Sequence, residues 1–379
     1  MFRFRTGVVA AATLAAMAGF ATPAFASGPG PGGGPGPAGG VVFVQTDNTA
    51  GNQVVAYQRA AGGTLTQVGS YPTGGLGGVL TGSVVDHLAS QGSLQYDPRR
   101  SLLFAVNAGS NTVSVFSVYG DRLARRQVLN SGGSFPVSIA VHGDLVYVLN
   151  ALNGGSVQGY RLFGDFLVPL PGSTRALGLD PTETPQFTST PGQVAFTPDG
   201  TQLVVTTKNN GNDIDVFGVG FGGLLSRTPA VNAEPGTVPF GIAFDTSGDL
   251  VIAEAGPNAL ATFSVARDGT VSAISELANA QTATCWVASA GRYLFAGNAG
   301  SATETGYSSA AGQLTLIADT NTDAGTVDAS ATPDGRFLYV QAGAAGIVDE
   351  FSVGAGGSLT PLGSVTVPGA VGGEGIVAS

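Results

Sequence analysis

The chain has 379 residues, a formal net charge of −10 and only 11% charged residues, whereas 43% of its residues are apolar. This composition is too apolar for a disordered chain, and its 60 glycines are too many for a helical protein, so it favours an all-β fold with many turns. The negative charge makes nucleic acid and anionic lipid poor partners, and we expect neither.

The first 26 residues have the pattern of a cleaved signal peptide. Arg3 and Arg5 precede an apolar run at 7–20, and Ala24 and Ala26 fit the small residues of a cleavage site. This run is too short for a comfortable membrane span and no later run reaches that length, so we expect a secreted protein without a membrane span. Residues 27–40 contain only Ser, Gly, Pro and Ala, which predicts a flexible linker before a folded domain at 41–379.

A short turn pattern, small residue-Gly/Asp-x-Leu, recurs along this domain. The interval is about 45 residues, with two intervals longer by about 13, and a period of this length with several short strands is typical of propeller blades. The seven turns end at Leu65, Leu123, Leu167, Leu225, Val271, Leu314 and Leu359.

Each repeat can be divided into four strands, A to D. Strand A alternates between apolar and polar residues, as at 240–246, and a turn such as TPDG at 197–200 leads into a strongly apolar strand B, as at 145–150. Strand C follows a Gly/Asn loop, and strand D follows the recurring turn. The pattern therefore predicts seven blades of four antiparallel strands.

The two ends of the domain predict how the ring closes. The segment 41–47 has the pattern of a strand B with no strand A before it, and 373–379 has the pattern of a strand A with no strand B after it. We therefore expect the C-terminal strand to complete the first blade, which removes the exposed sheet edges of an open ring.

Loop parity separates structural turns from candidate binding loops. In antiparallel blades the A-B and C-D hairpins share one face, whereas the B-C and D-A loops share the other, where propellers bind ligands. Both long intervals, 72–91 and 171–192, and the loop 208–213 fall on this second face. The candidate ligand-binding residues in these segments are Asp86, His87, Asp180, Glu183, Lys208 and Asp213.

Other chemistry has weaker support in the sequence. His142 falls at an A-B turn, where a solvated side chain is expected, and the single Cys285 lies between small and apolar residues as a small buried hydrophobe would. The loop 208–213 and the acidic run 319–328 raise a calcium hypothesis, but 208–213 lacks the alternating Asp pattern of a calcium loop. We expect no metal and no cofactor.

The repeats resemble a known family. The segments ATPDGRFLYVQ at 331–341 and LTQVGSYPTGG at 65–75 are similar to the propeller lactonases, which include 6-phosphogluconolactonase-like and carboxymuconate-cyclizing members. The resemblance implies catalytic His and Arg residues on neighbouring blades and a Glu at the end of a strand B. This chain has Gly192, Phe240 and Gly241 where His, Arg and His would stand, and only Glu254 falls near the expected carboxylate.

The missing histidines and arginine change the function that we expect. A lone carboxylate can activate a water molecule but does not stabilise the oxyanion of an opening lactone. We therefore expect a monomeric, non-catalytic protein that binds a small molecule, a sugar or an extracellular protein. The alternative is a lactone hydrolase or lactone-forming cyclase with a remodelled site around Glu254 and Lys208; a purely structural envelope protein is a third reading.

Overall fold

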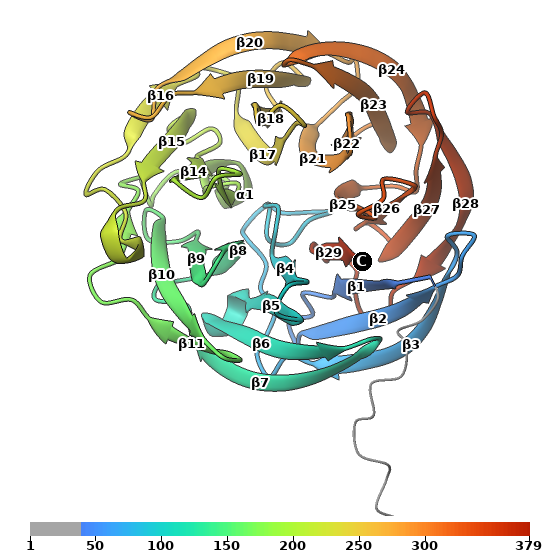
Figure 1. Cartoon of the computed structure of the whole chain (residues 1–379), viewed down its shortest axis with the longest axis horizontal. Helices are drawn as coiled ribbons and strands as arrows, with labels where there is room; N and C mark the ends of the chain where they lie inside the picture. Colours follow the sequence, from blue (N-terminus) through green and yellow to red (C-terminus); the bar gives the residue numbers. More distant parts are fainter. Residues whose placement is uncertain (1–38) are drawn as a thin grey trace, which may run out of the picture. The chain divides into compact units, whose positions relative to one another are not determined.

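The computed structural model describes residues 39–379, so the predicted signal peptide and nearly all of the predicted linker lie outside the described residues. These residues form seven antiparallel sheets arranged in a ring (Figure 1). Each sheet has four main strands in sequence order, except where the chain ends meet, and one sheet has a short fifth strand. This confirms the predicted seven-bladed β-propeller.

The first four blades contain the following strands. Blade 1 contains β29 (Ile376–Ala378), β1 (Val41–Gln45), β2 (Gln53–Arg59) and β3 (Leu65–Pro72), and blade 2 contains β4 (Leu94–Asp97), β5 (Leu102–Asn107), β6 (Thr112–Tyr119) and β7 (Arg122–Asn130). Blade 3 contains β8 (Pro136–His142), β9 (Leu145–Asn150), β10 (Ser156–Phe163) and β11 (Phe166–Pro169), with the short β12 (Arg175–Ala176) also paired to β10. Blade 4 contains β13 (Val194–Phe196), β14 (Gln202–Thr206), β15 (Asp213–Gly218) and β16 (Ala230–Ala233).

Each of the last three blades contains four consecutive strands. Blade 5 contains β17 (Pro239–Phe244), β18 (Leu250–Glu254), β19 (Ala259–Val265) and β20 (Val271–Ala278). Blade 6 contains β21 (Thr284–Ala290), β22 (Tyr293–Asn298), β23 (Thr303–Ala310) and β24 (Gln313–Asn321), and blade 7 contains β25 (Thr326–Ala331), β26 (Phe337–Ala342), β27 (Ile347–Val353) and β28 (Leu359–Thr366). The helical segments among residues 39–379 are α1 (Gln186–Ser189) and two single 3₁₀ turns, η1 (Ala108–Ser110) and η2 (Phe221–Gly223).

The ring closes through the chain ends. β29 pairs with β1 in an antiparallel register in which Phe43 faces Val377, so the last strand supplies the innermost strand of the first blade. The prediction from the two end segments is confirmed. Closure matters for this chain because Cys285 is its only cysteine and the domain therefore has no internal disulfide.

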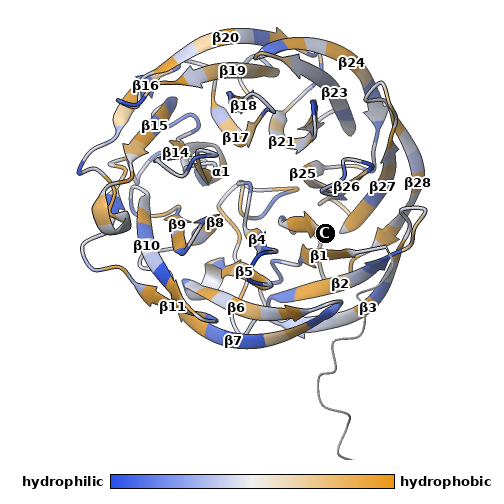
Figure 2. Cartoon of the chain, in the orientation of Figure 1, coloured by the Kyte–Doolittle hydropathy of each residue, from blue (hydrophilic) through white to orange (hydrophobic). Residues whose placement is uncertain are grey.

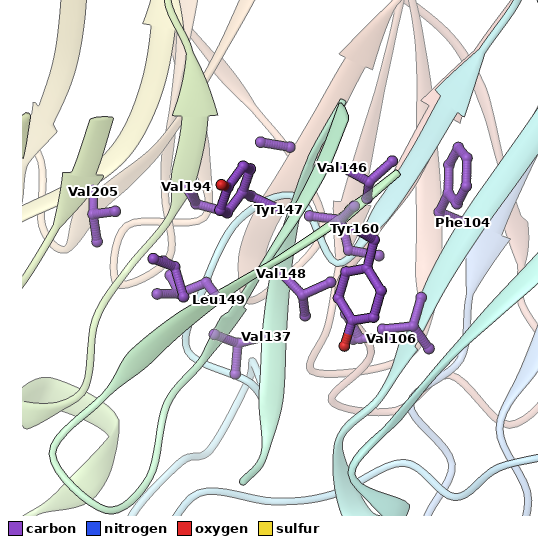
Figure 3. Packing of buried hydrophobic residues seen from close by; sticks show 14 of the residues in the cluster. Phe104, Val106, Val137, Val146, Tyr147, Val148, Leu149, Tyr160, Val194 and Val205 are labelled. Carbon is purple, nitrogen blue, oxygen red and sulfur yellow. The ribbon is translucent and has the colours of Figure 1, made fainter. Parts of the chain in front are cut away.

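The core lies between the blades. All residues of β5 and β26 are buried, as expected for strands packed on both faces, whereas the outermost β7 and β28 carry exposed residues along their length. Figure 2 shows the corresponding mixture of hydrophilic and hydrophobic segments on the outer strands. Figure 3 shows Tyr147 and Tyr160 beside valines and Leu149 of the largest core cluster, which joins blades 2, 3 and 4.

The predicted turns lie where loop parity placed them. The TPDG turn at 197–200 joins β13 to β14, the seven recurring turns join the third and fourth strands of their blades, and His142 is exposed at the β8–β9 turn. The two long intervals fall in the β3–β4 connection and in the β11–β13 connection. None of the helices within residues 39–379 has the length and apolarity needed to cross a bilayer.

Candidate functional site

The β3–β4 connection (residues 73–93) enters the ring and fills part of its centre (Figure 1). The Gln91 backbone N–H donates to the carbonyl of Gly192 beside blade 4 at 3.2 Å, and the Ser90 hydroxyl donates to the carbonyl of Val137 in blade 3 at 2.9 Å. On the other side, the Trp286 indole in blade 6 donates to the carbonyl of Ser90 at 2.8 Å. This connection therefore contacts blades on opposite sides of the ring.

Asp86 shapes this connection. Its carboxylate accepts the backbone N–H groups of Leu88, Ala89 and Ser90 at 2.8 to 2.9 Å, and the residue is only 4% exposed. Burial raises the pKa of Asp86 to about 6, while the three backbone hydrogen bonds and the charge of Lys208 act in the opposite direction. Asp86 thus holds a tight turn of its own segment.

Lys208 joins the two long connections. Its Nζ donates to the carbonyls of Ala89 at 2.6 Å and Phe187 at 2.7 Å and to the hydroxyl of Thr190 at 3.2 Å, and it lies 5.0 Å from the centre of the Phe240 ring. An ammonium group has three hydrogens, so these bonds use all of them. Burial lowers the pKa of Lys208 to about 7, and the nearby Asp86 carboxylate opposes this shift.

A cavity of about 170 Å³ lies beside this lysine, between blades 4, 5 and 6 and the two connections. Its wall includes Trp286 and Phe240, whose rings meet edge to face with centroids 5.1 Å apart. The other lining residues are Ser83, Val84, Val85, Asp86, Ala89, Phe187, Thr188, Lys208, Val238, Ala255, Ala283, Cys285 and Ala299. Nearly all of the exposed lining is apolar.

Cys285 belongs to this cavity wall. The sequence predicts a small buried hydrophobe, but the structure gives Cys285 a partly exposed position facing the cavity. Burial of the sulfur raises the pKa of the Cys285 thiol to about 12, so the thiol is neutral at physiological pH and lacks the reactivity of a thiolate.

The other predicted residues of the two connections form no hydrogen bond with Lys208, whose partners are Ala89, Phe187 and Thr190. His87 is half-buried against Gly372, its backbone N–H donates to the Gly372 carbonyl at 2.8 Å, and burial lowers the pKa of its imidazole. Asp180 and Glu183 are exposed. Asp180 accepts hydrogen bonds from the backbone and hydroxyl of Thr182, which lower the pKa of its carboxyl group.

Glu254 lies among other acids. It is the last residue of β18 and is 2% exposed, and its buried Oε2 has no hydrogen-bond partner. Burial, together with the charges of Glu276 and Glu234, raises the pKa of Glu254 to about 8. Asp213 is a half-buried residue at the start of β15 whose carboxyl pKa is raised by burial. The structure therefore brings Lys208 together with Asp86, while the charged groups that act on Glu254 are two glutamates.

Gly192 and Gly241, the two glycines that stand where the family resemblance implies histidines, lie against neighbouring chain. A Cβ added at Gly192 would lie 3.0 Å from the Phe240 carbonyl oxygen, and a Cβ added at Gly241 would collide with the Gln91 side chain and lie 2.8 Å from the carbonyl oxygen of Cys285. The space beside Gly241 is thus filled by Gln91 from the β3–β4 connection. A histidine at either position would require its surroundings to move.

Sequence reasoning missed Gln91, which binds the backbone of Val287 in blade 6. It also missed Trp286 and Phe240 as residues of the cavity wall. These are amide and aromatic residues without a catalytic motif, and they come from three different connections or blades. The sequence offered only indirect signals for these residues: Gln91 lies in one of the two long connections, and Trp286 is the one tryptophan of the chain. Within residues 39–379, no group of three or more His, Cys, Asp or Glu side chains is arranged to hold a metal ion.

The fold and this site define a seven-bladed propeller whose centre is partly filled by its own chain. The sequence matches the family described as "Lactonase, 7-bladed beta-propeller" over residues 79–372, and the chain belongs to this family. No curated protein sequence matches it.

Solved structures share the fold at low sequence identity. A putative 6-phosphogluconolactonase from Bacteroides fragilis NCTC 9343 is 19% identical with a TM-score of 0.68, over 89% of this chain and 97% of that one. The periplasmic gluconolactonase of Pseudomonas aeruginosa is 19% identical with a TM-score of 0.70, over 89% of this chain and 98% of that one. A protein from Lactobacillus plantarum is also 19% identical with a TM-score of 0.70, over 90% and 99% of the two chains. At this identity the likeness concerns the fold alone.

Proposed function

We propose that this chain is a ligand-binding member of the lactonase propeller family that does not open lactones. The observation that carries the proposal is the apolar cavity on the face of the two long connections, in which the nearest charged groups are already fully engaged. Propellers use this face for recognition, and an apolar pocket with a few polar groups is the usual form of a small-molecule site.

Lactone opening needs a base that activates water and a donor that stabilises the developing oxyanion. Around the cavity, the Lys208 hydrogens bind two carbonyls and a hydroxyl, and the Asp86 carboxylate binds three backbone N–H groups. The Cys285 thiol is neutral because burial raises its pKa to about 12. These engaged groups support binding without turnover.

The second candidate is lactone hydrolysis, or the reverse cyclization, centred on Glu254. One observation favours it: Glu254 has a carboxyl pKa of about 8 and an unpartnered Oε2, which suits a group that exchanges protons near neutral pH. Two structural neighbours are a putative 6-phosphogluconolactonase and a gluconolactonase, so sugar lactones are the substrates to test.

A lactone panel assayed on the wild-type chain and on Glu254→Gln separates the two candidates. The proposal expects no turnover above the uncatalysed rate for D-glucono-1,5-lactone, its 6-phosphate or aliphatic lactones. Turnover that Glu254→Gln abolishes would instead support the hydrolase. We also propose export through the predicted signal peptide, which fractionation of cells expressing the full chain would test by locating the protein outside the cytoplasm.

A further inference from the structure

We infer that the cavity takes an uncharged, apolar ligand about the size of one aromatic ring. This inference rests on the proposed function, because it names the ligand class of the same site. It differs from the sugar lactones named for the structural neighbours, which are polar molecules.

The size of the cavity sets the first limit. Its volume is about 170 Å³. An apolar cavity of about 150 Å³ is large enough to bind benzene, so this volume accommodates one substituted ring or a short branched chain. The exposed side chain of Val84 (80% exposed) lies at its rim and marks the side open to solvent.

The chemistry of the walls sets the second limit. The edge-to-face pair of Phe240 and Trp286 forms an aromatic corner, and such corners favour a further aromatic ring. The Trp286 N–H is already donated to the Ser90 carbonyl, so the indole offers the cavity apolar surface and no free donor.

The charged groups at the cavity select against charged and polyhydroxylated ligands. A phosphate or carboxylate ligand needs free cationic donors, and the three hydrogens of Lys208 are bound to chain oxygens. A sugar ring would bury hydroxyl groups without partners, which is unfavourable by about 1 to 3 kcal/mol for each unpaired group.

Both long connections build this site. The first supplies Val84 and Val85, the second supplies Phe187, and Lys208 ties the two together through Ala89 and Phe187. The apolar wall therefore depends on the same two segments that lengthen the repeat. The expected ligand class follows from the apolar side chains that these two connections supply.

Tryptophan fluorescence tests the inference directly, because Trp286 is the only tryptophan in the chain and lines the cavity. Toluene is the neutral apolar probe, and benzoate and D-glucono-1,5-lactone are the charged and polar probes. We expect a saturable change in Trp286 emission with toluene that is insensitive to salt, since neither partner contributes a free charge. We expect no saturable change with the other two probes.

A cavity-blocking variant supplies the matched control. Ala299→Leu adds apolar bulk to the cavity wall and should weaken toluene binding about tenfold by excluding the ring from its contacts. Ala273→Leu makes the same chemical change on the exposed outer strand β20, away from the cavity, and should leave toluene binding unchanged. Thermal unfolding of both variants checks that they are folded.

The outcomes separate the ligand class from the proposed function. Tighter saturable binding of gluconolactone or benzoate than of toluene would overturn the apolar ligand class, as would toluene binding that Ala299→Leu does not weaken. Lactone turnover abolished by Glu254→Gln would overturn the non-catalytic function while leaving the apolar cavity intact.

Discussion

Gln91 pairs with the backbone of Val287 in both directions. Its Nε2 donates to the Val287 carbonyl at 2.7 Å, and its Oε1 accepts the Val287 N–H at 3.0 Å, although the two residues are 196 positions apart in the chain. This pair fastens the β3–β4 connection to blade 6 inside the ring. It also occupies the space beside Gly241 that a larger residue would need.

The first prediction concerns Gln91→Ala. The change leaves the buried N–H and carbonyl of Val287 without partners, so we expect the free energy of unfolding to fall by about 2 to 4 kcal/mol. Urea unfolding followed by far-ultraviolet circular dichroism measures this loss.

A matched control comes from Gln127, which makes the same two-way pair with the backbone of Leu167 at 3.0 and 2.8 Å but is partly exposed. Water can replace its hydrogen bonds, so Gln127→Ala should lower the free energy of unfolding by about 1 kcal/mol or less. If both variants lost the same free energy of unfolding, burial of the Gln91 hydrogen bonds would not increase their contribution to stability.

The second prediction concerns Lys208→Met. The variant keeps the length of the apolar stem but removes the ammonium group, leaving the carbonyls of Ala89 and Phe187 unpaired. We expect the free energy of unfolding to fall by about 2 to 4 kcal/mol, because a buried charged donor is lost from its acceptors.

Hydrogen exchange shows where this destabilisation acts, since amides of residues 73–93 and 171–193 should lose protection before those of the blade strands. The exposed Arg227→Met removes a cation without buried partners and should leave both stability and exchange unchanged. Unchanged protection of the two connections in Lys208→Met would show that the hydrogen bonds of Lys208 do not hold them in place.

The third prediction concerns pH. Asp47 is fully buried, accepts hydrogen bonds from Gln45 and from the backbone of Glu374, and has a pKa raised by burial to about 8. A pKa above the unfolded value means that the stabilisation is fully present below about pH 4 and is lost as pH rises through about 8. Asp328, with a pKa of about 7, acts in the same direction. The free energy of unfolding should therefore be higher near pH 5 than near pH 9.

Asp47→Asn tests the source of this slope. Asn resembles the protonated carboxyl group and tolerates the left-handed backbone at this position (φ 50°), so the variant should lose less stability between pH 5 and 9 than the wild type. Asp268→Asn is the control, because this exposed carboxyl has a lowered pKa and titrates below that range. An unchanged slope in Asp47→Asn would show that Asp47 is not responsible.

The fourth prediction concerns Cys285. With a thiol pKa of about 12, almost no thiolate exists near pH 8, so iodoacetamide should modify the folded protein about a hundredfold more slowly or less than the urea-unfolded chain. Mass spectrometry of the intact chain gives both rates. Toluene should slow the folded reaction further, because Cys285 lines the cavity. If iodoacetamide modified the folded and unfolded chains at the same rate, the Cys285 thiol could not be buried as described.

The blade architecture could be predicted from local patterns in the chain. Each blade repeats its own signals, such as the TPDG turn at 197–200 and the turn ending at Leu225, and these act between residues close in the chain. Ring closure could also be predicted from the sequence. The segment 41–47 has the pattern of a strand B without a preceding strand A, and 373–379 has the pattern of the missing strand A. Loop parity then placed Lys208 and the two long connections on one face, since antiparallel strands alternate direction.

Contacts between residues far apart in the chain could be seen only after folding. Lys208 binds Ala89, which is 119 positions away, and Gln91 binds Val287, and no local pattern encodes either contact. Asp86 and Lys208 looked like free ligand contacts in the sequence, but folding engages both with chain atoms. The cavity wall comes from blades 4, 5 and 6 together with both connections, so its apolar character follows from packing between distant segments, which the periodicity of single strands does not record.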